Sequence, residues 1–482
     1  MNKVCDAADW FRPELDRTVR EALEELPRCH RKQWEFAVLY RALELHGMLG
    51  PEREGISFGS GTERLLYSVA RRVKHLWATD LYGDVTTWDT ARTADAAAFV
   101  RGAAPFAIPD GTLSARRMDM REIAFPDASF DFAWSSCAIE HIGGTGDFLR
   151  HLREVHRVLK PGGIYALTTE LTFLDAPVAQ PGNHFFSRRE LELLARQSGF
   201  EVSGGVVDAR LTEHELNTPL PVEVASGLND GEGRFGERLF GSLAHLHLAN
   251  ANVPFTSCVL TLRRAEGGAS LNEPWRWEGF EGSARFVEAG LSRMRRLVEE
   301  SSLPLHPFAA LPERRSPHFA GHEAFFSREG RAAERDAVHT AYVWLGAKPR
   351  TVRVHLASRG GAGGTFTVRV QRLDVRHPPG RVETLWEGDV QLQGGQRTLE
   401  LPINPRDDAR YAIVARPKGS GRAPLLEEVT VTALPAGSQP RNELGEVSWP
   451  FDLRATLRDP IELPLTAARN LVRRLRAPLR GG

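Results

Sequence analysis

This chain of 482 residues contains few cysteines and few lysines, and its formal net charge is zero. The four cysteines (Cys5, Cys29, Cys137 and Cys258) form no C-x-x-C pair, which excludes a zinc ribbon and argues against a disulfide framework. The 62 basic and 62 acidic residues cancel, so no nucleic-acid partner is expected, because such binders usually carry a basic excess. No apolar run reaches the roughly 18 residues of a membrane span, and the acidic N-terminal residues do not form a signal peptide. We expect a reducing, cytoplasmic setting.

Arginine replaces lysine almost throughout, with 56 arginines against six lysines. The base composition of a genome is the simplest explanation of such a bias. The number of arginines therefore does not by itself indicate recognition of phosphate or carboxylate groups.

The hydrophobic pattern divides the chain into five parts. Residues 1–50 predict a helical lead that Gly47 and Gly50-Pro51 end, and residues 51–265 alternate short apolar runs with helical stretches. This alternation predicts an α/β fold, a Rossmann-like doubly wound sheet of seven strands. The expected strands are 55–58, 75–79, 114–118, 130–135, 164–168, 200–207 and 255–263, and the expected helices are 62–72, 146–159 and 188–198.

The remaining three parts follow a different pattern. Residues 266–336 read as a connector with a helix over Ala284–Glu300, whereas residues 337–435 alternate with a period of two between glycine-rich and proline-rich turns. The latter pattern predicts a C-terminal all-β, sandwich-like domain. Residues 436–482 form an irregular tail, in which Ala467–Arg476 is either a solvated segment or a short basic amphipathic helix in weak contact with an anionic membrane surface.

Gly59-Ser60-Gly61 is the most informative segment of the sequence. It follows an apolar strand and opens a helix, so its backbone can approach a ligand closely. Asp80 ends the second expected strand, 21 residues after Gly59, where a carboxylate can accept hydrogen bonds from both hydroxyls of a ribose. The pattern indicates an adenosine-containing cofactor.

The residues after the glycines distinguish two such cofactors. A dinucleotide fingerprint needs a third glycine where Arg64 stands, and Glu63 would occupy the place of a pyrophosphate. S-adenosylmethionine contains no phosphate, so it tolerates Glu63. We therefore prefer S-adenosylmethionine to a nicotinamide dinucleotide.

Three further motifs follow in order: Met118-Asp119-Met120, then Phe125–Ser136 with Ile139-Glu140-His141-Ile142, then Leu159-Lys160-Pro161-Gly162-Gly163. This succession resembles class I S-adenosylmethionine-dependent methyltransferases of the type 11-like kind, over roughly residues 30–265. Two positions depart from the usual pattern, since Ser57 stands where most relatives have an acid and Glu63 where many have a third glycine. The G-x-G-x-E form is similar to that of a subset of the family.

The resemblance implies roles for individual residues. Gly59, Ser60 and Gly61 would contact the methionine moiety of S-adenosylmethionine, and Asp80 would bind the ribose. Asp119 would pair with the adenine amino group, while Met120 would pack on the ring. Ser135 to His141 follow the fourth strand at the mouth of the site, so we also count Ser135 among the cofactor-binding residues.

Methyl transfer to a hydroxyl requires positioning of the acceptor and removal of a proton. The sequence offers His141 as the first candidate base, Glu140 as the group that orients it or contacts the methionine amine, and His184 as a second candidate base. The alternative is that Glu140 and His141 only shape the loop.

The other histidines are predicted to be structural. His245 and His247 lie close together, but no acids stand nearby at ligand spacing to join them and His214 in a metal site, so no metal is predicted. His151 and His156, on the helix before the glycine turn, are expected to be surface or packing residues.

The C-terminal β domain suggests what kind of molecule accepts the methyl group. Its aromatic residues Trp344, Trp386 and Tyr411 either stack on sugars or belong to its core. An appended module suits a polymeric acceptor, because a second site raises the effective concentration. We therefore expect O-methylation of a sugar or glycan precursor in glycan biosynthesis. The alternatives are O- or N-methylation of a small metabolite, and a non-catalytic glycan-binding or scaffold protein with the same fold; the oligomeric state stays open.

Overall fold

The computed structural model describes residues 1–27, 30–83, 91–180, 182–222, 245–264, 274–300, 303–305, 307–309, 338–340, 342–358, 361, 363–375, 382–418 and 426–437. The basic segment Ala467–Arg476 lies outside these residues, as does most of the connector. None of the helices in the described ranges has the length and apolar character needed to span a membrane.

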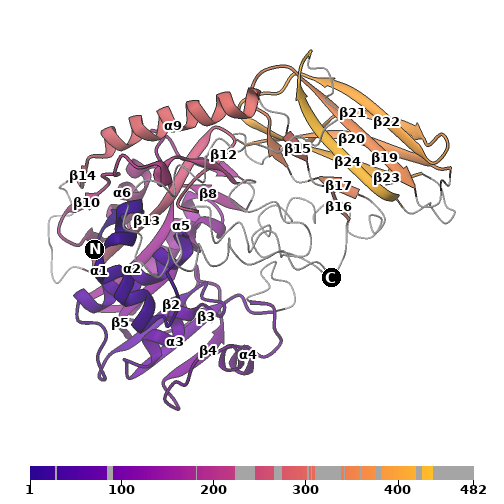
Figure 1. Cartoon of the computed structure of the whole chain (residues 1–482). Coiled ribbons are helices and arrows are strands. Elements are labelled where there is room, and N and C mark those ends of the chain that lie inside the picture. Colours follow the sequence, from indigo (N-terminus) through magenta and orange to yellow (C-terminus); the bar gives the residue numbers. More distant parts are fainter. Residues whose placement is uncertain are drawn as a thin grey trace.

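A mixed sheet forms the first half of the molecule (Figure 1). Its central strands lie in the order β4-β3-β2-β5-β6-β13, with β9 paired to β13. The pairs from β4 to β6 are parallel, and β13 is antiparallel to both β6 and β9. The bounds are β2 Glu54–Phe58, β3 His75–Asp80, β4 Leu113–Arg117, β5 Phe130–Ser136, β6 Leu159–Thr172, β9 Phe200–Val202 and β13 Val253–Arg264. The Rossmann-like fold predicted from the sequence is confirmed.

The sheet is wider than predicted, because it has twelve strands instead of seven. The expected strand over 200–207 divides into β9 and a separate β10, which pairs with β1 from the N-terminal lead. The additional strands are β1 Lys3–Val4, β10 Val206–Asp208, β11 Leu220–Pro221, β12 His247–Asn250 and β14 Arg276–Glu278. Such short strands lack the alternation of period two on which a strand prediction depends.

Helices cover both faces of this sheet. On one face, α5, α6 and the first part of α9 share a core with the sheet, whereas α1, α2, α3 and α4 share a core with the other face. The bounds are α1 Pro13–Arg17, α2 Arg31–Leu45, α3 Arg64–Ala70, α4 Ala96–Gly102, α5 Thr145–Val158, α6 Arg188–Gln197 and α9 Phe280–Glu300. Capping follows the expected chemistry at α6, where the side chain of Ser187 accepts a hydrogen bond from the backbone of Glu190. Helices α3, α4 and α5 lie in the connections β2–β3, β3–β4 and β5–β6, and helices on both faces give the doubly wound arrangement.

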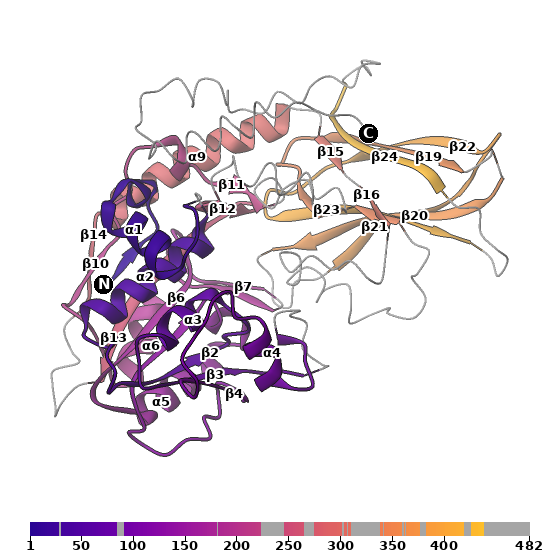
Figure 2. The ribbon, with the colours of Figure 1, turned by 60° about the horizontal axis from the view of Figure 1, so that its bottom comes forward.

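The C-terminal β region folds as two facing antiparallel sheets (Figure 2). One has the order β15-β24-β19-β22 and the other β16-β17-β23-β20-β21, with β18 beside β23. Alternate residues of both sheets form one core, as in a sandwich. The bounds are β15 Leu303–Leu305, β16 Pro307–Ala309, β17 Val338–Thr340, β18 Val343–Trp344, β19 Arg350–Ser358, β20 Thr365–Asp374, β21 Val382–Gln391, β22 Gln396–Ile403, β23 Ala409–Pro417 and β24 Leu426–Pro435. The predicted sandwich is confirmed.

The three aromatic residues of the sandwich are not equivalent. Trp344 and Tyr411 are buried, whereas Trp386 on the outer strand β21 is 36% exposed. The core interpretation therefore holds for the first two residues, and only Trp386 presents a ring at the surface.

The sandwich is joined to the large sheet by α9, which runs between them (Figure 1). Leu291, Met294 and Val298 of this helix share an apolar cluster with residues of both halves, including Phe255 and Trp344. Polar contacts supplement the cluster, with Arg295 on α9 bound to Asp407 of the sandwich at 2.8 Å. The two halves therefore form a continuous interface.

Candidate functional site

The glycine loop after β2 has the backbone conformation that a ligand-binding turn requires. Gly59 and Gly61 have φ angles of +59° and +46°, which side chains with a Cβ rarely adopt. A Cβ on Gly59 would also lie 2.6 Å from Cβ of Ala138 in the loop after β5. The first glycine is therefore needed both for its conformation and for the close approach of the two loops.

Asp80 and Ser60 hold this loop in place. Oδ2 of Asp80 accepts a hydrogen bond of 2.8 Å from the backbone N–H of Gly61, and Oδ1 accepts one from Leu81. Ser60 donates from its hydroxyl and its backbone to the carbonyl of Thr79. Burial raises the pKa of Asp80. Each carboxylate oxygen of Asp80 keeps acceptor capacity, so the residue can still bind hydroxyl groups.

Asp119 and Met120 follow β4 at the same edge of the sheet. The guanidinium of Arg121 donates to both oxygens of Asp119, with the shortest contact at 2.6 Å, and these hydrogen bonds lower the pKa of Asp119. Met120 is buried. The sequence did not single out Arg121, which fixes the orientation of the carboxylate expected to meet the adenine.

The hydroxyl of Ser135 lies in a buried chain of hydrogen bonds. It contacts the hydroxyl of Tyr165 at 2.6 Å, which in turn lies 2.9 Å from Nε2 of His151. Nδ1 of His151 is 2.8 Å from the carbonyl of Met120. A carbonyl only accepts, so Nδ1 carries the proton; Tyr165 then donates to Nε2 and accepts from Ser135.

Of the two alternatives expected for His151, a surface or a packing residue, the structure shows the second, because this side chain is fully buried and hydrogen-bonded at both nitrogens. Burial lowers the pKa of His151 to about 4, so the ring is neutral. Its partner Tyr165 comes from strand β6.

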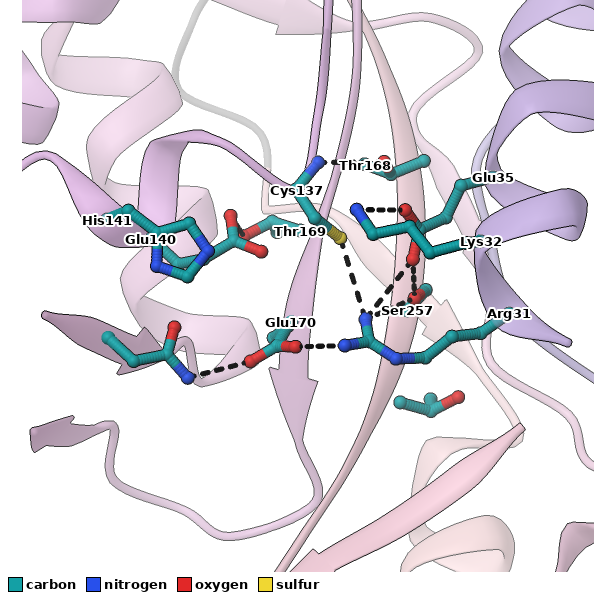
Figure 3. Close-up of polar contacts among 12 residues, drawn as sticks. Arg31, Lys32, Glu35, Cys137, Glu140, His141, Thr168, Thr169, Glu170 and Ser257 are labelled. Atoms are coloured by element: carbon teal, nitrogen blue, oxygen red, sulfur yellow. Dashed lines mark hydrogen bonds and ion pairs between the residues drawn. The ribbon is translucent and has the colours of Figure 1, made fainter. Parts of the chain in front are cut away.

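Six ionisable side chains gather above the ends of β5 and β6, and we call them the charge cluster. Helix α2 contributes three of them, which face the residues after β5 and on β6 (Figure 3). Together they comprise two cations and four carboxyl groups, with the G-x-G-x-E loop contributing one of the latter. The charge cluster consists of Arg31, Lys32, Glu35, Glu63, Glu140 and Glu170.

Two of the four carboxyl groups in the cluster are paired with the cations. Arg31 donates to Glu170 at 2.5 Å and to Glu35 at 3.2 Å, and Nζ of Lys32 lies 2.9 Å from Glu35. Ser257 on β13 donates to the same carboxylate. Although burial opposes ionisation, the two cations lower the pKa of Glu35.

The other two carboxyl groups, of Glu63 and Glu140, are not fully satisfied. Oε2 of Glu63 and Oε1 of Glu140 are enclosed by protein but have no hydrogen-bond partner among the described residues. Burial raises the pKa of Glu63 to about 8 and also raises that of Glu140. Burial therefore favours the protonated form of both groups.

His141 lies next to Glu140 at the rim of the charge cluster (Figure 3). Its Nδ1 is 2.8 Å from the carbonyl oxygen of Gly182, so Nδ1 carries the hydrogen and the lone pair of the neutral ring is on Nε2. Burial lowers the pKa of His141, which favours the neutral ring. The side chain has the tautomer that a general base needs.

Gly182 belongs to the hairpin of β7 (Val178–Gln180) and β8 (Asn183–Phe185), which closes one side of the site. The amide of Asn183 donates to Glu170 at 2.9 Å. On the other side of the hairpin, the side chain of Gln180 accepts from Asn250, whose amide oxygen in turn accepts from Arg410 of the sandwich. The hairpin thus links the charge cluster to the sandwich.

His184 is placed differently from His141. Its Nε2 is 2.7 Å from Oε2 of Glu190 on α6, and its ring packs against Phe148 and Phe186. The contacts with α6 and the two aromatic rings account for the burial of His184 without a ligand.

The remaining histidines also have structural partners. His247 on β12 is buried with Nε2 2.9 Å from the carbonyl of Cys5, and His245 stacks on His30 with ring centroids 4.2 Å apart. His245 and His247 therefore contact different parts of the chain.

The part of the site that the sequence missed comes from α2. The spacing of Arg31 and Glu35 is that of an i, i+4 ion pair on one helix face, which is a recognisable signal. Such pairs usually lie in solvent, however, and the arginine bias of the chain removed the remaining reason to single out Arg31.

Part of the chain is similar to a known protein family. Residues 56–167 match a family described as "Methyltransferase domain". Among curated proteins, nothing matches the chain. The solved structures to which the chain is similar include three methyltransferases.

An S-adenosylmethionine-dependent methyltransferase from Mesorhizobium loti is 18% identical, with 47% of this chain and 97% of that one covered and a TM-score of 0.29. A second structure is the 1,6-didemethyltoxoflavin-N1-methyltransferase of Burkholderia thailandensis, solved with 1,6-didemethyltoxoflavin and S-adenosylhomocysteine. It is 15% identical, and the match covers 49% of this chain and 79% of that one, with a TM-score of 0.31. The geranyl diphosphate C-methyltransferase of Streptomyces coelicolor is 16% identical. The match covers 55% of this chain and 90% of that one, with a TM-score of 0.33.

Proposed function

The chain carries a class I S-adenosylmethionine-dependent methyltransferase domain, and from this premise we propose that it methylates a hydroxyl group of a sugar or glycan precursor. S-adenosylmethionine is the cofactor. The observation that carries the proposal for a hydroxyl is the tautomer of His141, which leaves the lone pair of the ring on Nε2.

The residues present fit the cofactor. Gly59 and Gly61 provide the open loop, Asp80 keeps acceptor capacity at the end of β3, and Asp119 is oriented by Arg121 after β4. These residues, with Ser60, Met120 and the backbone at Ser135, would hold the cofactor at the carboxyl edge of the sheet. When bound, S-adenosylmethionine supplies a methyl group on a positively charged sulfur.

His141 is suited to accept the proton of an acceptor hydroxyl. Since Nδ1 is committed to the carbonyl of Gly182, the proton that a hydroxyl loses would move to Nε2. Burial lowers the pKa of His141, so the ring is neutral at neutral pH and can accept this proton. General base catalysis of this kind typically contributes about 10²–10⁴-fold in rate.

The surroundings of His141 favour a polar acceptor over an apolar one. Glu140, Glu170, Arg31 and Asn183 all contribute charged or amide groups to this end of the site. Sugars offer hydroxyl groups that can pair with such donors and acceptors. The β7–β8 hairpin also connects the site to the sandwich, which supports a role of the sandwich in holding a larger glycan.

The proposal is tested by transfer of a labelled methyl group from S-adenosylmethionine to host sugars and glycan fractions, using the full chain. In the wild type we expect label in an alkali-stable ether, and in His141→Ala a single-turnover rate at least tenfold lower. His355→Ala, at an exposed histidine of β19, is the control and should leave the rate unchanged.

Other outcomes would contradict the proposal. Label only in amines or small metabolites would replace the sugar acceptor. An unchanged rate in His141→Ala would remove His141 as the base, and binding of cofactor without transfer to any fraction would favour a non-catalytic glycan-binding or scaffold protein.

A further inference from the structure

The β7–β8 hairpin places two side-chain amides opposite each other. Gln180 and Asn183 are register partners in this antiparallel pair, so their side chains leave the same face of the hairpin, with Cβ atoms about 4.5–5.5 Å apart. Gly182, the residue before Asn183, is the one whose carbonyl oxygen lies 2.8 Å from Nδ1 of His141. The two amides therefore adjoin the candidate base.

Partners on either side fix the orientation of each amide. The guanidinium of Arg410 can only donate, so Oδ1 of Asn250 faces it at 3.4 Å, and the Asn250 amide nitrogen then donates to Oε1 of Gln180 at 3.0 Å. The carboxylate of Glu170 can only accept, and Nδ2 of Asn183 donates to it at 2.9 Å. In both hairpin amides one polar atom is bound and the other is left over.

The atoms left over are one donor and one acceptor. Nε2 of Gln180 and Oδ1 of Asn183 are enclosed by protein and have no hydrogen-bond partner among the described residues. An unpartnered polar atom costs free energy, and exchanging the two ends of either amide would break the bond that now holds it. A hydroxyl group matches this pair, because its oxygen accepts from an N–H while its hydrogen is donated to a carbonyl oxygen.

We propose that Gln180 and Asn183 bind a hydroxyl group of the acceptor, next to the hydroxyl that loses its proton to His141. The inference rests on the proposed function and deepens it, since it names residues that select the sugar. Neighbouring hydroxyl groups distinguish a sugar from a simple alcohol, and a site built to bind a hydroxyl rejects an analogue without it. Open space adjoins the turn between the two amides, because a Cβ on Gly182 would meet no atom within 4 Å.

The test uses the full chain, labelled S-adenosylmethionine and stepwise dilutions of the host sugar fraction that the wild type methylates. Gln180→Glu replaces the open N–H donor by an oxygen and keeps the oxygen that accepts from Asn250. We expect half-saturation to need at least tenfold more of the fraction, while the rate at saturation and the Kd of S-adenosylhomocysteine stay within twofold. Gln371→Glu is the matched control, because Oε1 of Gln371 accepts from the hydroxyl of Tyr342 in the sandwich, and it should leave all three quantities unchanged.

A second variant separates loss of the donor from addition of a charge. Gln180→Met removes the donor alone and should change half-saturation in the same direction, with thermal unfolding near the wild-type temperature. Half-saturation within twofold of the wild type in both variants would overturn the inference and mean that solvent satisfies the two amides. An equal loss in the Kd of S-adenosylhomocysteine would also overturn it, since the hairpin would then only shape the site. A wild type that labels no sugar fraction would contradict the proposed function itself, independently of the hairpin.

Discussion

In the charge cluster, most of the ionisable side chains are largely buried and the acids outnumber the bases, whereas the sandwich carries cross-strand ion pairs such as Arg353–Glu400 and Arg369–Glu387 on the outer faces of its sheets. Arg353 and Glu400 on neighbouring strands are a typical sandwich pair, with N···O at 2.6 Å and Glu400 56% exposed. Exposed pairs of this kind contribute about 0–1 kcal/mol. Buried charges without partners cost several times more, so a protein retains them where they serve a ligand. The comparison separates charge placed for binding from charge placed for solubility.

The largest expected effect comes from Arg31. Arg31→Ala removes the cation that pairs with Glu170 and one of two that pair with Glu35, and it leaves those carboxylates buried. We expect the free energy of unfolding to fall by about 3–5 kcal/mol, measured by urea titration of tryptophan fluorescence. Arg31→Ala combined with Glu170→Gln should recover part of the loss. A loss below about 1 kcal/mol would show that the cluster behaves like the sandwich pairs.

An effect of intermediate size concerns pH. The pKa of Glu63, raised by burial to about 8, keeps the group protonated below that pH, so binding of a cation requires the loss of a proton. The affinity for S-adenosylhomocysteine should therefore rise with pH, about tenfold from pH 6 to pH 7, and level off near pH 8.

Glu63 and Glu140 can both carry this pH dependence, because burial raises the pKa of each to about 8, and their separate variants distinguish them. Acidic neighbours raise the pKa of Lys32 against the effect of burial, and the cations lower that of Glu35, so neither titrates in this range. The pKa values of Asp80 and Glu140 are both raised by burial, and therefore Glu140→Gln is measured in parallel. Affinity that is flat with pH in the wild type, or equally steep in both variants, would contradict the assignment.

The smallest effect is expected in the sandwich. Arg353→Ala breaks the exposed pair with Glu400 and should change the free energy of unfolding by less than about 1 kcal/mol, decreasing further in 1 M salt. The same urea titration checks it. A cost as large as that of Arg31→Ala would remove the distinction between the two halves.

The sequence predicted the parts of the fold that repeat a simple period. Strands β2, β3, β5 and β13 begin and end within two residues of the expected positions, because each is a buried apolar run bounded by a turn or a glycine. The short strands β1, β11 and β14 were missed because two or three residues carry no period. The positions at which the domains divide stay predictions.

The site was predictable where it depends on the order of strand ends and motifs along the chain. Gly59, Asp80 and His141 follow strands whose carboxyl ends meet at one edge. The positions of Lys32 and Glu63 in the charge cluster depend on how α2 packs across that edge, and nothing in the local sequence specifies this packing. A glutamate at the start of a helix predicts a cap, and only the structure shows that Glu63 does not form one.

The pairing of the N-terminal residues with distant strands delays their folding during synthesis of the chain. Met1 bonds to Thr261, Asn2 to Ser203 and Arg31 to Ser257, across separations of 260, 201 and 226 residues. At a synthesis rate of about 5–20 residues per second, this interval lasts roughly 10–50 s. Throughout it, α2 with its apolar side chains Trp34 and Leu39 lacks the strand that will cover it. Helix α2 is thus made early but is among the last elements to reach its final place, and chaperones have the intervening time to act on it.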